Sequence, residues 1–251
     1  MITLFSHQFS LMDLLLFYAV ALCVGMSKTG VHGAGMIAVP LLASIFGGRL
    51  SSGMLLPMLV LADFMGVKYY HQHASWKHLK ILFPWAAVGV IAGTIAGLYI
   101  DDDVFKLAMA SIIVLSVIIM IWLQQGHKED VPDYKWFAIL MGIAGGFTSM
   151  FGNLAGAVMA VYLLAMRLPK NAYIGTTAWF FMVTNWFKLP FHIFVWKTIS
   201  LDGVLLDLTT LPVIGIGALL GIWIVKKIPE KYYRWFIIST TLLAAIIMLL
   251  K

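Results

Sequence analysis

No Asp, Glu, Lys or Arg occurs in the 31 residues from 136 to 166, which read WFAILMGIAGGFTSMFGNLAGAVMAVYLLAM. As one helix this run would measure about 46 Å, which is too long for a single crossing of a bilayer core of about 30 Å. It is also too short for two complete crossings and a turn. In its middle the helix formers give way to small and polar residues, namely Gly145, Gly146, Thr148, Ser149, Gly152 and Asn153. The run is therefore predicted to break into two short arms, either as half-helices or as a re-entrant hairpin.

A second apolar run, residues 14–48, repeats this pattern. Its centre, residues 25–35, reads GMSKTGVHGAG and is flanked by arms that are too short to cross a bilayer comfortably. Broken backbone leaves amide groups without helical partners, and these groups find none in lipid. Each of the two breaks is therefore expected to face protein or a water-filled cavity.

The composition excludes a water-soluble globule. Of the 251 residues, 62% are hydrophobic and 11% are charged, whereas an average soluble domain carries about 25% charge. The 17 Lys and Arg against 11 Asp and Glu indicate loops beside anionic lipid, and they do not favour nucleic-acid binding. The N-terminus has no basic residue ahead of its apolar stretch and carries His7 and Asp13. It is therefore interpreted as part of the first membrane segment and not as a cleaved signal peptide.

Six further stretches have the length of single membrane spans. Three are nearly free of charge, namely residues 81–100, 107–127 and 203–225, the last with Asp207 near its start. The other three are residues 50–67 with Asp63, residues 171–196 with Lys188, and residues 235–250. At roughly 20 apolar residues per crossing, these spans and the two broken runs fill the chain, which leaves no room for a separate soluble domain.

The two broken runs suggest an internal duplication. An offset of 122 residues aligns Ser27 with Ser149, Gly30 with Gly152, Ala38 with Ala160, Leu41 and Leu42 with Leu163 and Leu164, Gly53 with Gly175, and Asp63 with Asn185. An offset of 128 continues the alignment with Pro84 and Pro212, Gly89 and Gly217, Gly93 and Gly221, and Lys106 and Arg234. Chance matches in a chain rich in Gly and Leu are the alternative, but the ordered Gly and Pro matches favour a repeat. The predicted halves are residues 1–128 and 129–251 of one membrane domain.

The repeat predicts an all-α polytopic membrane protein in which each half holds a broken pair and three transmembrane helices. The number of crossings per half is then odd, so the halves are inverted in the membrane. One face of the bilayer would hold eleven basic residues, Lys68, Lys77, Lys80, Lys128, Lys135, Arg167, Lys170, Lys226, Lys227, Lys231 and Arg234. The other face would hold four, Arg49, Lys106, Lys197 and Lys251. This asymmetry predicts both termini on the outer side, and inverted repeats with broken helices are typical of secondary transporters with a site near the midplane.

A glycine cluster ahead of a proline carries a resemblance to a known family. Gly30, Gly33, Ala34, Gly35 and Pro40 stand in this pattern, with Gly53 and Asp63 in the next span. In this respect the chain resembles the TauE/SafE family of sulfite exporters and toluene-sulfonate uptake permeases, over nearly its whole length. It departs from the family pattern at Ala34, which replaces the middle glycine, and in the second copy, where Gly152, Asn153, Ala155 and Gly156 precede Tyr162. The resemblance implies export or uptake of small sulfur-containing anions such as sulfite, sulfoacetate or sulfonates.

The first break holds the most informative charge. An ammonium group at Lys28 is costly inside a membrane unless it faces a cavity or a counter-charge, and an anionic substrate would supply that charge. The half-helix from about Gly33 onward would direct its free amide groups at the same point. The candidate substrate-binding residues of this break are Ser27, Lys28, Thr29, Gly30, His32, Gly33 and Gly35. The alternative is that Lys28 reaches a nearby membrane surface through a shallow loop.

The second break, with Thr148, Ser149, Gly152 and Asn153, is neutral and would add hydroxyl and amide donors; its candidate substrate-binding residues are Ser149, Gly152 and Asn153. Together the two breaks would suit a monoanion or a small dianion. The alternative is that these small polar residues only satisfy backbone groups in a turn.

Three polar residues within apolar spans are candidates for coupling or gating, Asp63, Asn185 and Lys188. A carboxyl group inside the membrane is a functional candidate, and Asp63 has several possible roles. It would pair with Lys28 or Lys188, carry a coupling proton, or make a polar helix contact near the cytoplasmic end.

Other chemistries have little support in the sequence. His71, His73 and His78 lie among lysines in a loop without a completing Cys, Asp or Glu, so no metal site is predicted. Asp101, Asp102 and Asp103 are expected to cap a helix that begins near Val104. No catalytic residues and no cofactor are predicted, because the phosphate-loop, metalloprotease and serine-hydrolase motifs are missing.

The sequence therefore predicts a secondary transporter in the cell (inner) membrane, with a small sulfur-containing anion as substrate and the lipid bilayer as its surroundings. A passive anion facilitator and a non-transporting component of a membrane assembly are the alternatives. No nucleic-acid partner is expected, and a homo-oligomer is left open.

Overall fold

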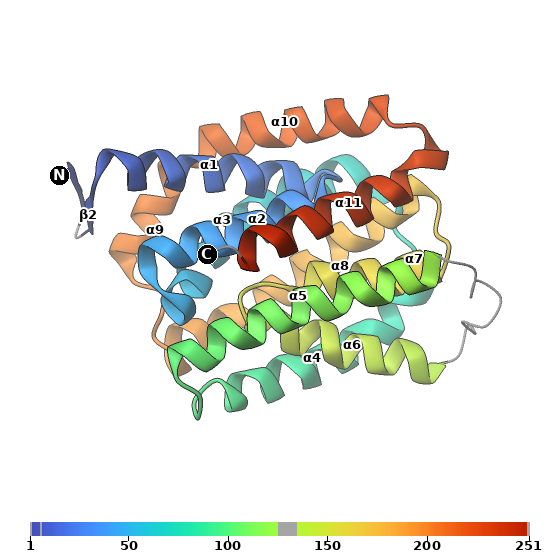
Figure 1. Ribbon diagram of the computed structural model, residues 1–251, viewed down its shortest axis with the longest axis horizontal. Coiled ribbons are helices and arrows are strands. Elements are labelled where there is room, and N and C mark those ends of the chain that lie inside the picture. Colours follow the sequence, from blue (N-terminus) through green and yellow to red (C-terminus); the bar gives the residue numbers. More distant parts are fainter. Residues whose placement is uncertain (1, 6, 125–134, 250–251) are drawn as a thin grey trace.

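Both predicted breaks interrupt the helices of the computed structural model, which describes residues 2–5, 7–124 and 135–249 (Figure 1). Helix α1 (Leu11–Lys28) ends at the first break and α2 (His32–Phe46) begins after it, while α6 (Lys135–Met150) and α7 (Ala155–Ala165) flank the second. Within the breaks Gly30 has φ +116° and Gly152 has φ +69°. Glycine adopts this left-handed conformation without steric cost, so both turns rely on it.

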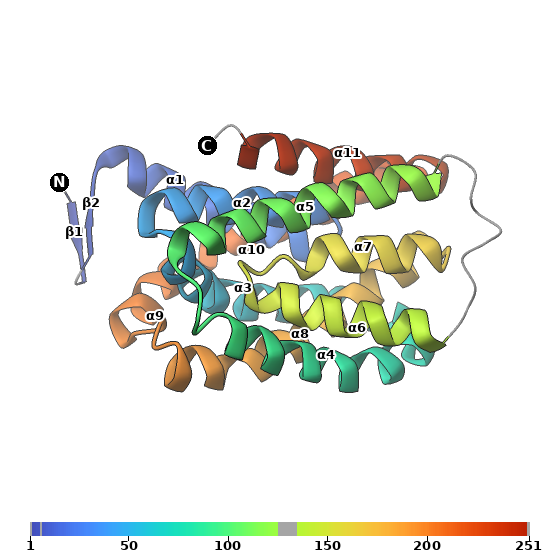
Figure 2. The same ribbon diagram turned by 60° about the horizontal axis from the view of Figure 1, so that its bottom comes forward.

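Each broken pair folds back on itself, since α1 packs on α2 and α6 packs on α7 (Figure 2). The remaining helices are α3 (Gly48–Tyr70), α4 (Trp76–Ala96), α5 (Asp102–Gln124), α8 (Lys170–Pro190), α9 (Leu201–Leu208), α10 (Leu211–Lys227) and α11 (Glu230–Leu249). A short 3₁₀ turn (His71–His73) follows α3, and a π-helical turn (Phe191–Val195) follows α8. Helix α1 begins and α11 ends toward the same side of the bundle, at the left of Figure 1.

The described residues include three helices that are long and apolar enough to cross a membrane, or four if a bent pair counts as one span. The three are Leu11–Lys28, Gly48–His73 and Trp76–Ala96. In the apolar 18-residue window of Gly48–His73, 72% is buried inside the protein, whereas the corresponding share is 39% for each of the other two helices. Helix α3 is therefore central, and side chains of the outer helices are left to face lipid.

The span expected at residues 203–225 is not one continuous helix, because a bend of 53° separates α9 from α10. The Thr209 and Thr210 hydroxyl groups donate to the carbonyl groups of Leu206 and Asp207, which competes with the continuing helix. Pro212 lacks the amide hydrogen that a continuous helix would require there. Small polar residues and a proline thus end α9 where the apolar pattern alone predicts continuity.

The N-terminal residues also differ from the expectation of a continuous membrane segment. Strands β1 (Ile2–Leu4) and β2 (His7–Phe9) form an antiparallel hairpin before α1 begins. The Ser10 hydroxyl accepts the amide hydrogen of Asp13 at 3.1 Å, and the Asp13 carboxylate accepts that of Ser10 at 3.1 Å. This reciprocal capping fixes the start of α1 at Leu11.

Glycines allow the helix backbones to approach closely. A Cβ atom at Gly25 would overlap the Ile214 carbonyl group in the contact of α1 with α10, and one at Gly89 would overlap that of Ile143 in the contact of α4 with α6. Close contacts of small residues are a main source of helix association in membranes, where apolar surfaces gain little by leaving lipid. The two helix pairs α1–α10 and α4–α6 are the most extensive in the structure.

One aspartate caps a helix other than its own. As expected, the Asp101 carboxylate accepts the amide hydrogen of Val104 at 2.8 Å, although α5 already begins at Asp102. The Asp102 carboxylate instead accepts the amide hydrogens of Gly48 and Arg49, at 2.9 and 2.8 Å, at the start of α3. It thereby holds the α2–α3 turn against α5.

Replacing Asp102 by alanine is expected to lower the free energy of unfolding by about 1–2 kcal/mol, because two amide hydrogens of α3 lose their acceptor. The measurement is the Tm of the purified protein in detergent, followed by tryptophan fluorescence. Asp102→Asn keeps one acceptor oxygen, so its Tm should lie between those of Asp102→Ala and the unmodified protein. Equal Tm values for all three proteins would contradict the capping role.

Candidate functional site

A polar contact between the two central helices lies at the heart of the site. Asp63 of α3 and Asn185 of α8 are both buried, with exposed fractions of 0% and 2%. The Asn185 side-chain amide donates to Asp63 Oδ2 at 2.7 Å. These residues are also the pair that the offset of 122 aligns. Their contact joins the two halves of the chain in the interior of the bundle.

Lys28, the last residue of α1, is the counter-charge of Asp63. Its ammonium nitrogen lies 2.8 Å from Asp63 Oδ1, and its side chain is only 5% exposed. The same nitrogen lies 4.4 Å from the ring centre of Phe181, within the range of a cation–π contact. The structure therefore does not support the alternative in which Lys28 reaches a membrane surface.

Lys188 supplies a second buried amino group at the second break. It is 0% exposed, and its ammonium nitrogen donates to the Ser149 carbonyl group at 3.0 Å and to Asn153 Oδ1 at 2.5 Å. Asn153 in turn donates to the Ser52 carbonyl group at 3.1 Å. The second break is neutral in its own sequence, as predicted, but the fold adds a lysine from α8 to it.

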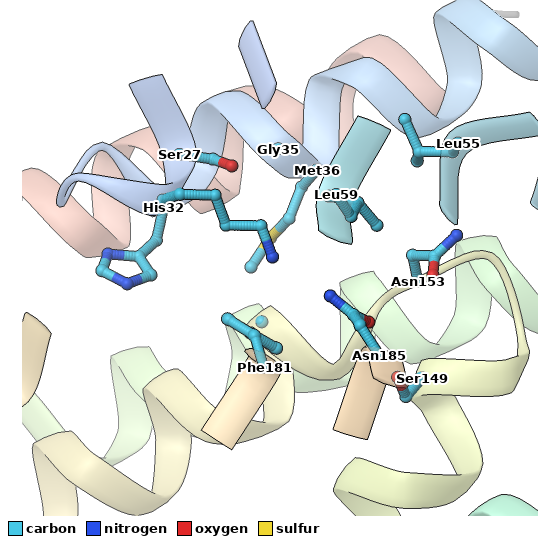
Figure 3. A pocket seen from close by; sticks show the side chains of 12 residues that line it. Ser27, His32, Gly35, Met36, Leu55, Leu59, Ser149, Asn153, Phe181 and Asn185 are labelled. Carbon is cyan, nitrogen blue, oxygen red and sulfur yellow. The ribbon is translucent and has the colours of Figure 1, made fainter. Parts of the chain in front are cut away.

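A cavity of about 30 Å³ lies between the two breaks (Figure 3). About 10–15 Å³ of such space holds one water molecule, so the cavity suits a small occupant. It is lined by Ser27, Lys28, His32, Gly35, Met36, Leu55, Leu59, Ser149, Asn153, Gly156, Phe181 and Asn185. In Figure 3 the labelled side chains of Ser27, His32 and Leu59 lie opposite those of Asn153, Phe181 and Asn185. Both halves of the chain thus contribute to one cavity.

Six of the ten predicted substrate-binding residues line this cavity, Ser27, Lys28, His32, Gly35, Ser149 and Asn153. Of the three coupling or gating candidates, Asn185 lines it as well. Asp63 and Lys188 lie directly behind the lining, since each is bonded to lining residues.

The other four predicted binding residues have contacts away from the cavity. Thr29 donates to the Ala218 carbonyl group of α10 at 3.0 Å, and Gly33 lies so close to Thr240 of α11 that a Cβ atom would overlap it. Gly30 and Gly152 form the two turns, and the Gly30 carbonyl group accepts the Tyr233 hydroxyl hydrogen at 2.9 Å. These residues shape the breaks and do not line the cavity.

The imidazole ring of His32 connects the cavity to an aromatic cluster. Its Nδ1 atom lies 3.2 Å from the Gly30 carbonyl oxygen, and its ring packs edge-on against Tyr173 at 5.1 Å. Tyr173 also packs against Tyr233 at 5.9 Å. The aromatic cluster of His32, Tyr173 and Tyr233 thereby fills the space beside the first break.

Phe181, Met36, Leu55, Leu59 and Gly156 were not predicted as lining residues. Three of them follow from helix periodicity, because Phe181 precedes Asn185 by four residues and Leu59 and Leu55 precede Asp63 by four and eight. Residues at this spacing share one helix face. The offset of 122 also aligns Leu59 with Phe181. No comparable signal identifies Met36.

The electrostatics of the site favour an anion. The ion pair of Lys28 with Asp63 and the amino group of Lys188 lie in a water-poor interior, where an uncompensated charge is costly. Each break also places the start of a helix, α2 or α7, beside the cavity, and helix starts carry partial positive charge. Among the described residues, no group of three His, Cys, Asp or Glu side chains lies close enough to hold a metal ion.

Comparisons with known proteins place the chain in a family. A family model described as sulfite exporter TauE/SafE matches residues 17–248. No curated protein and no solved structure matches the chain.

Proposed function

The chain belongs to the sulfite exporter TauE/SafE family of membrane transporters, and from this premise we propose that it is a secondary transporter of small sulfur-containing anions. The substrate is a sulfite- or sulfonate-type anion, and export is the proposed direction. It binds in the cavity between the two helix breaks, at or beside Lys28. The proposed role is transport and not catalysis.

The observation that carries the proposal is the unequal number of buried charges around the cavity. Lys28 is paired with Asp63 at 2.8 Å, whereas Lys188 donates to a carbonyl oxygen and an amide oxygen. Both are neutral groups that only partly offset an ammonium charge. An anion in the adjoining cavity would supply the missing negative charge, and charged groups inside a membrane commonly mark such substrate paths.

The two halves, residues 1–128 and 129–251, are proposed to be inverted repeats that rock about this site. In support, the packing of α1 on α10 corresponds to that of α6 on α4, and the packing of α2 on α11 corresponds to that of α7 on α5. The central pair, α3 and α8, are themselves equivalent under the offset of 122. Inverted repeats allow two states of similar energy, in which the cavity opens to opposite sides of the membrane.

The membrane orientation is a further part of the proposal. We place both termini on the outer side of the cell membrane, because basic residues are concentrated in the loops at the opposite face. The start of α1 and the end of α11 lie toward the same side of the bundle (Figure 1), as an even number of crossings requires.

Flux into proteoliposomes tests the function. Radiolabelled sulfite, sulfoacetate, sulfate and chloride would be offered to vesicles with and without the purified protein. We expect saturable uptake of a sulfite- or sulfonate-type anion, and we expect that preloading the vesicles with unlabelled anion accelerates entry of the labelled anion. Such counterflow requires a carrier whose site faces one side at a time.

Two other results would overturn the proposal. Flux that rises linearly with concentration, without counterflow, would indicate a passive anion facilitator. Absence of flux for every anion, with protein that is folded and inserted, would favour a non-transporting component of a membrane assembly.

A further inference from the structure

Three buried ionisable side chains of the described residues, Lys28, Lys188 and Asp63, lie at or directly behind the lining of the cavity. Lys28 and Lys188 each carry one positive charge when protonated, and Asp63 carries one negative charge when ionised. Asp63 faces Lys28 from α1 at 2.8 Å and interacts electrostatically with Lys188 from α8. Lys188 lies also beside His192 of the π-helical turn. With both lysines protonated and Asp63 ionised, the sum is one positive charge.

The two histidines near the site do not change this sum. The Nδ1 atom of His32 lies 3.2 Å from the Gly30 carbonyl oxygen, and that of His192 lies 2.9 Å from Thr198 Oγ1. Both rings are buried, and each lies near a lysine ammonium group. A protonated imidazole ring so close to a lysine ammonium group is unfavourable unless a carboxylate of its own offsets the charge. Both rings are therefore counted as neutral.

We propose that the site binds anions that carry a single negative charge, and that the charge of Asp63 sets this limit. This inference rests on the proposed function and narrows it to singly charged substrates, such as a sulfonate or hydrogensulfite. A doubly charged anion, such as sulfate or fully ionised sulfite, would leave one negative charge uncompensated. Asp63 is then a specificity-determining residue that acts through its charge.

The charge balance of the occupied site is the same whichever lysine the anion contacts. If the anion approaches Lys28, it competes with Asp63 for one ammonium group, and Lys188 balances the remaining negative charge. If Lys188 is neutral in the empty site, it takes up a proton as the anion arrives, and the occupied site again sums to zero. In both cases, with Asp63 ionised, one negative charge is compensated and a second is not, and uncompensated charge in a low-dielectric interior is costly.

The structure provides a nearly isosteric way to change the sum. Asn185 occupies the position equivalent to Asp63 under the offset of 122, and it already donates to Asp63 at 2.7 Å. An asparagine at position 63 would therefore fit, and it can keep a side-chain hydrogen bond to Asn185. Asp63→Asn raises the sum from one positive charge to two, which matches a doubly charged anion.

Binding of two anions with fixed charges tests the proposal. Methanesulfonate is singly charged and sulfate is doubly charged throughout the neutral pH range, and both would be titrated calorimetrically into the purified full-length protein. We expect the unmodified protein to bind methanesulfonate at least about tenfold more tightly than sulfate. In Asp63→Asn the order should reverse. Binding of neither anion, a preference for sulfate in the unmodified protein, or an unchanged order in the variant would overturn the proposal.

A single and a double variant show whether binding follows the total charge of the site or a local effect of one residue. Lys188→Met reduces the sum to zero and should weaken methanesulfonate binding at least about tenfold. Adding Asp63→Asn to it restores one positive charge, carried by Lys28, which lines the cavity. We expect the double variant to regain methanesulfonate binding. Failure to regain it, in protein with an unchanged size-exclusion profile, would contradict the charge sum; if Lys188→Met alone does not fold, the Asp63→Asn comparison decides.

Binding and flux together distinguish this inference from the proposed function. Charge-selective binding without flux in proteoliposomes would contradict the proposed transport function but would support the preference for singly charged anions. Flux with a preference for doubly charged anions would support the transport function but would overturn the proposed preference for singly charged anions.

Discussion

Lys28→Met is expected to reduce saturable anion flux by at least about a hundredfold. Methionine has a similar length but loses the cation–π contact with Phe181, whose ring centre lies 4.4 Å from the Lys28 nitrogen. It removes the ammonium group that lines the cavity. At an effective dielectric constant of about 20, two unit charges 4 Å apart interact by about 4 kcal/mol, and each 1.4 kcal/mol corresponds to a factor of ten.

The same substitution leaves Asp63 buried without its ion-pair partner, so a loss of flux must be separated from a loss of stability. Removing one partner of a buried ion pair costs about 3–5 kcal/mol. Lys28→Met combined with Asp63→Asn removes both charges and should recover most of the Tm lost in the single variant.

The double variant Lys28→Met with Asp63→Asn should still not transport. Its remaining cation, Lys188, lies behind the cavity lining and donates to Ser149 and Asn153. The measurement is proteoliposome uptake at equal amounts of inserted protein, beside the Tm in detergent. Transport by the double variant at the rate of the unmodified protein would show that the anion does not rely on Lys28.

The two helix breaks were predictable from the length of the second apolar run and from the repetition of its glycine-rich, polar centre in the first. A charge-free run of 31 residues does not fit a bilayer as one helix or as two full spans, and its small residues indicate where it turns. The break ending α1 at Lys28 and the break ending α6 at Met150 both fall within the predicted segments. Polar residues in apolar spans similarly marked Asp63 and Asn185 as candidates.

The partners of the buried charges were not predictable from the same patterns. The sequence leaves both Lys28 and Lys188 open as partners of Asp63, since sequence separation does not show which helices cross at which depth. The fold brings Lys188 to Asn153 instead, across 35 residues. Likewise, apolar periodicity predicts one span at residues 203–225, because hydropathy does not register the bend that Thr209, Thr210 and Pro212 introduce.

Some of the predicted binding residues lie away from the cavity for a related reason. Glycines and small hydroxyl residues occur in membrane helices for close packing as well as for ligand contact. Thr29 contacts α10 and Gly33 contacts α11, although both lie within a few residues of Lys28. Only the direction in which each residue points, which the fold determines, separates the two roles.

Gly217→Ala is expected to destabilise the protein strongly, whereas Gly215→Ala, two residues earlier on α10, is not. A Cβ atom at Gly217 would overlap the backbone carbonyl oxygen of Leu22 in α1, which does not move without separating the helices. Overpacking of this kind costs about 1–3 kcal/mol and sometimes more. A Cβ atom at Gly215 would meet only Met65 Cε, at an ordinary distance of 3.8 Å.

The measurement is the Tm of both variants in the same detergent. For a chain of this size each 1 kcal/mol shifts Tm by roughly 2–4 °C, so a fall of several degrees is expected for Gly217→Ala. Gly215→Ala should match or exceed the unmodified protein, because alanine favours a helix over glycine by about 1 kcal/mol. Equal Tm values for the two variants would contradict the close packing of α1 on α10.

The contact of α1 with α10 also bears on the site, because α1 ends at Lys28 and Thr29 packs on α10 at Ala218. Forcing the two helices apart should therefore move the ammonium group away from Asp63, so Gly217→Ala should reduce anion binding together with stability.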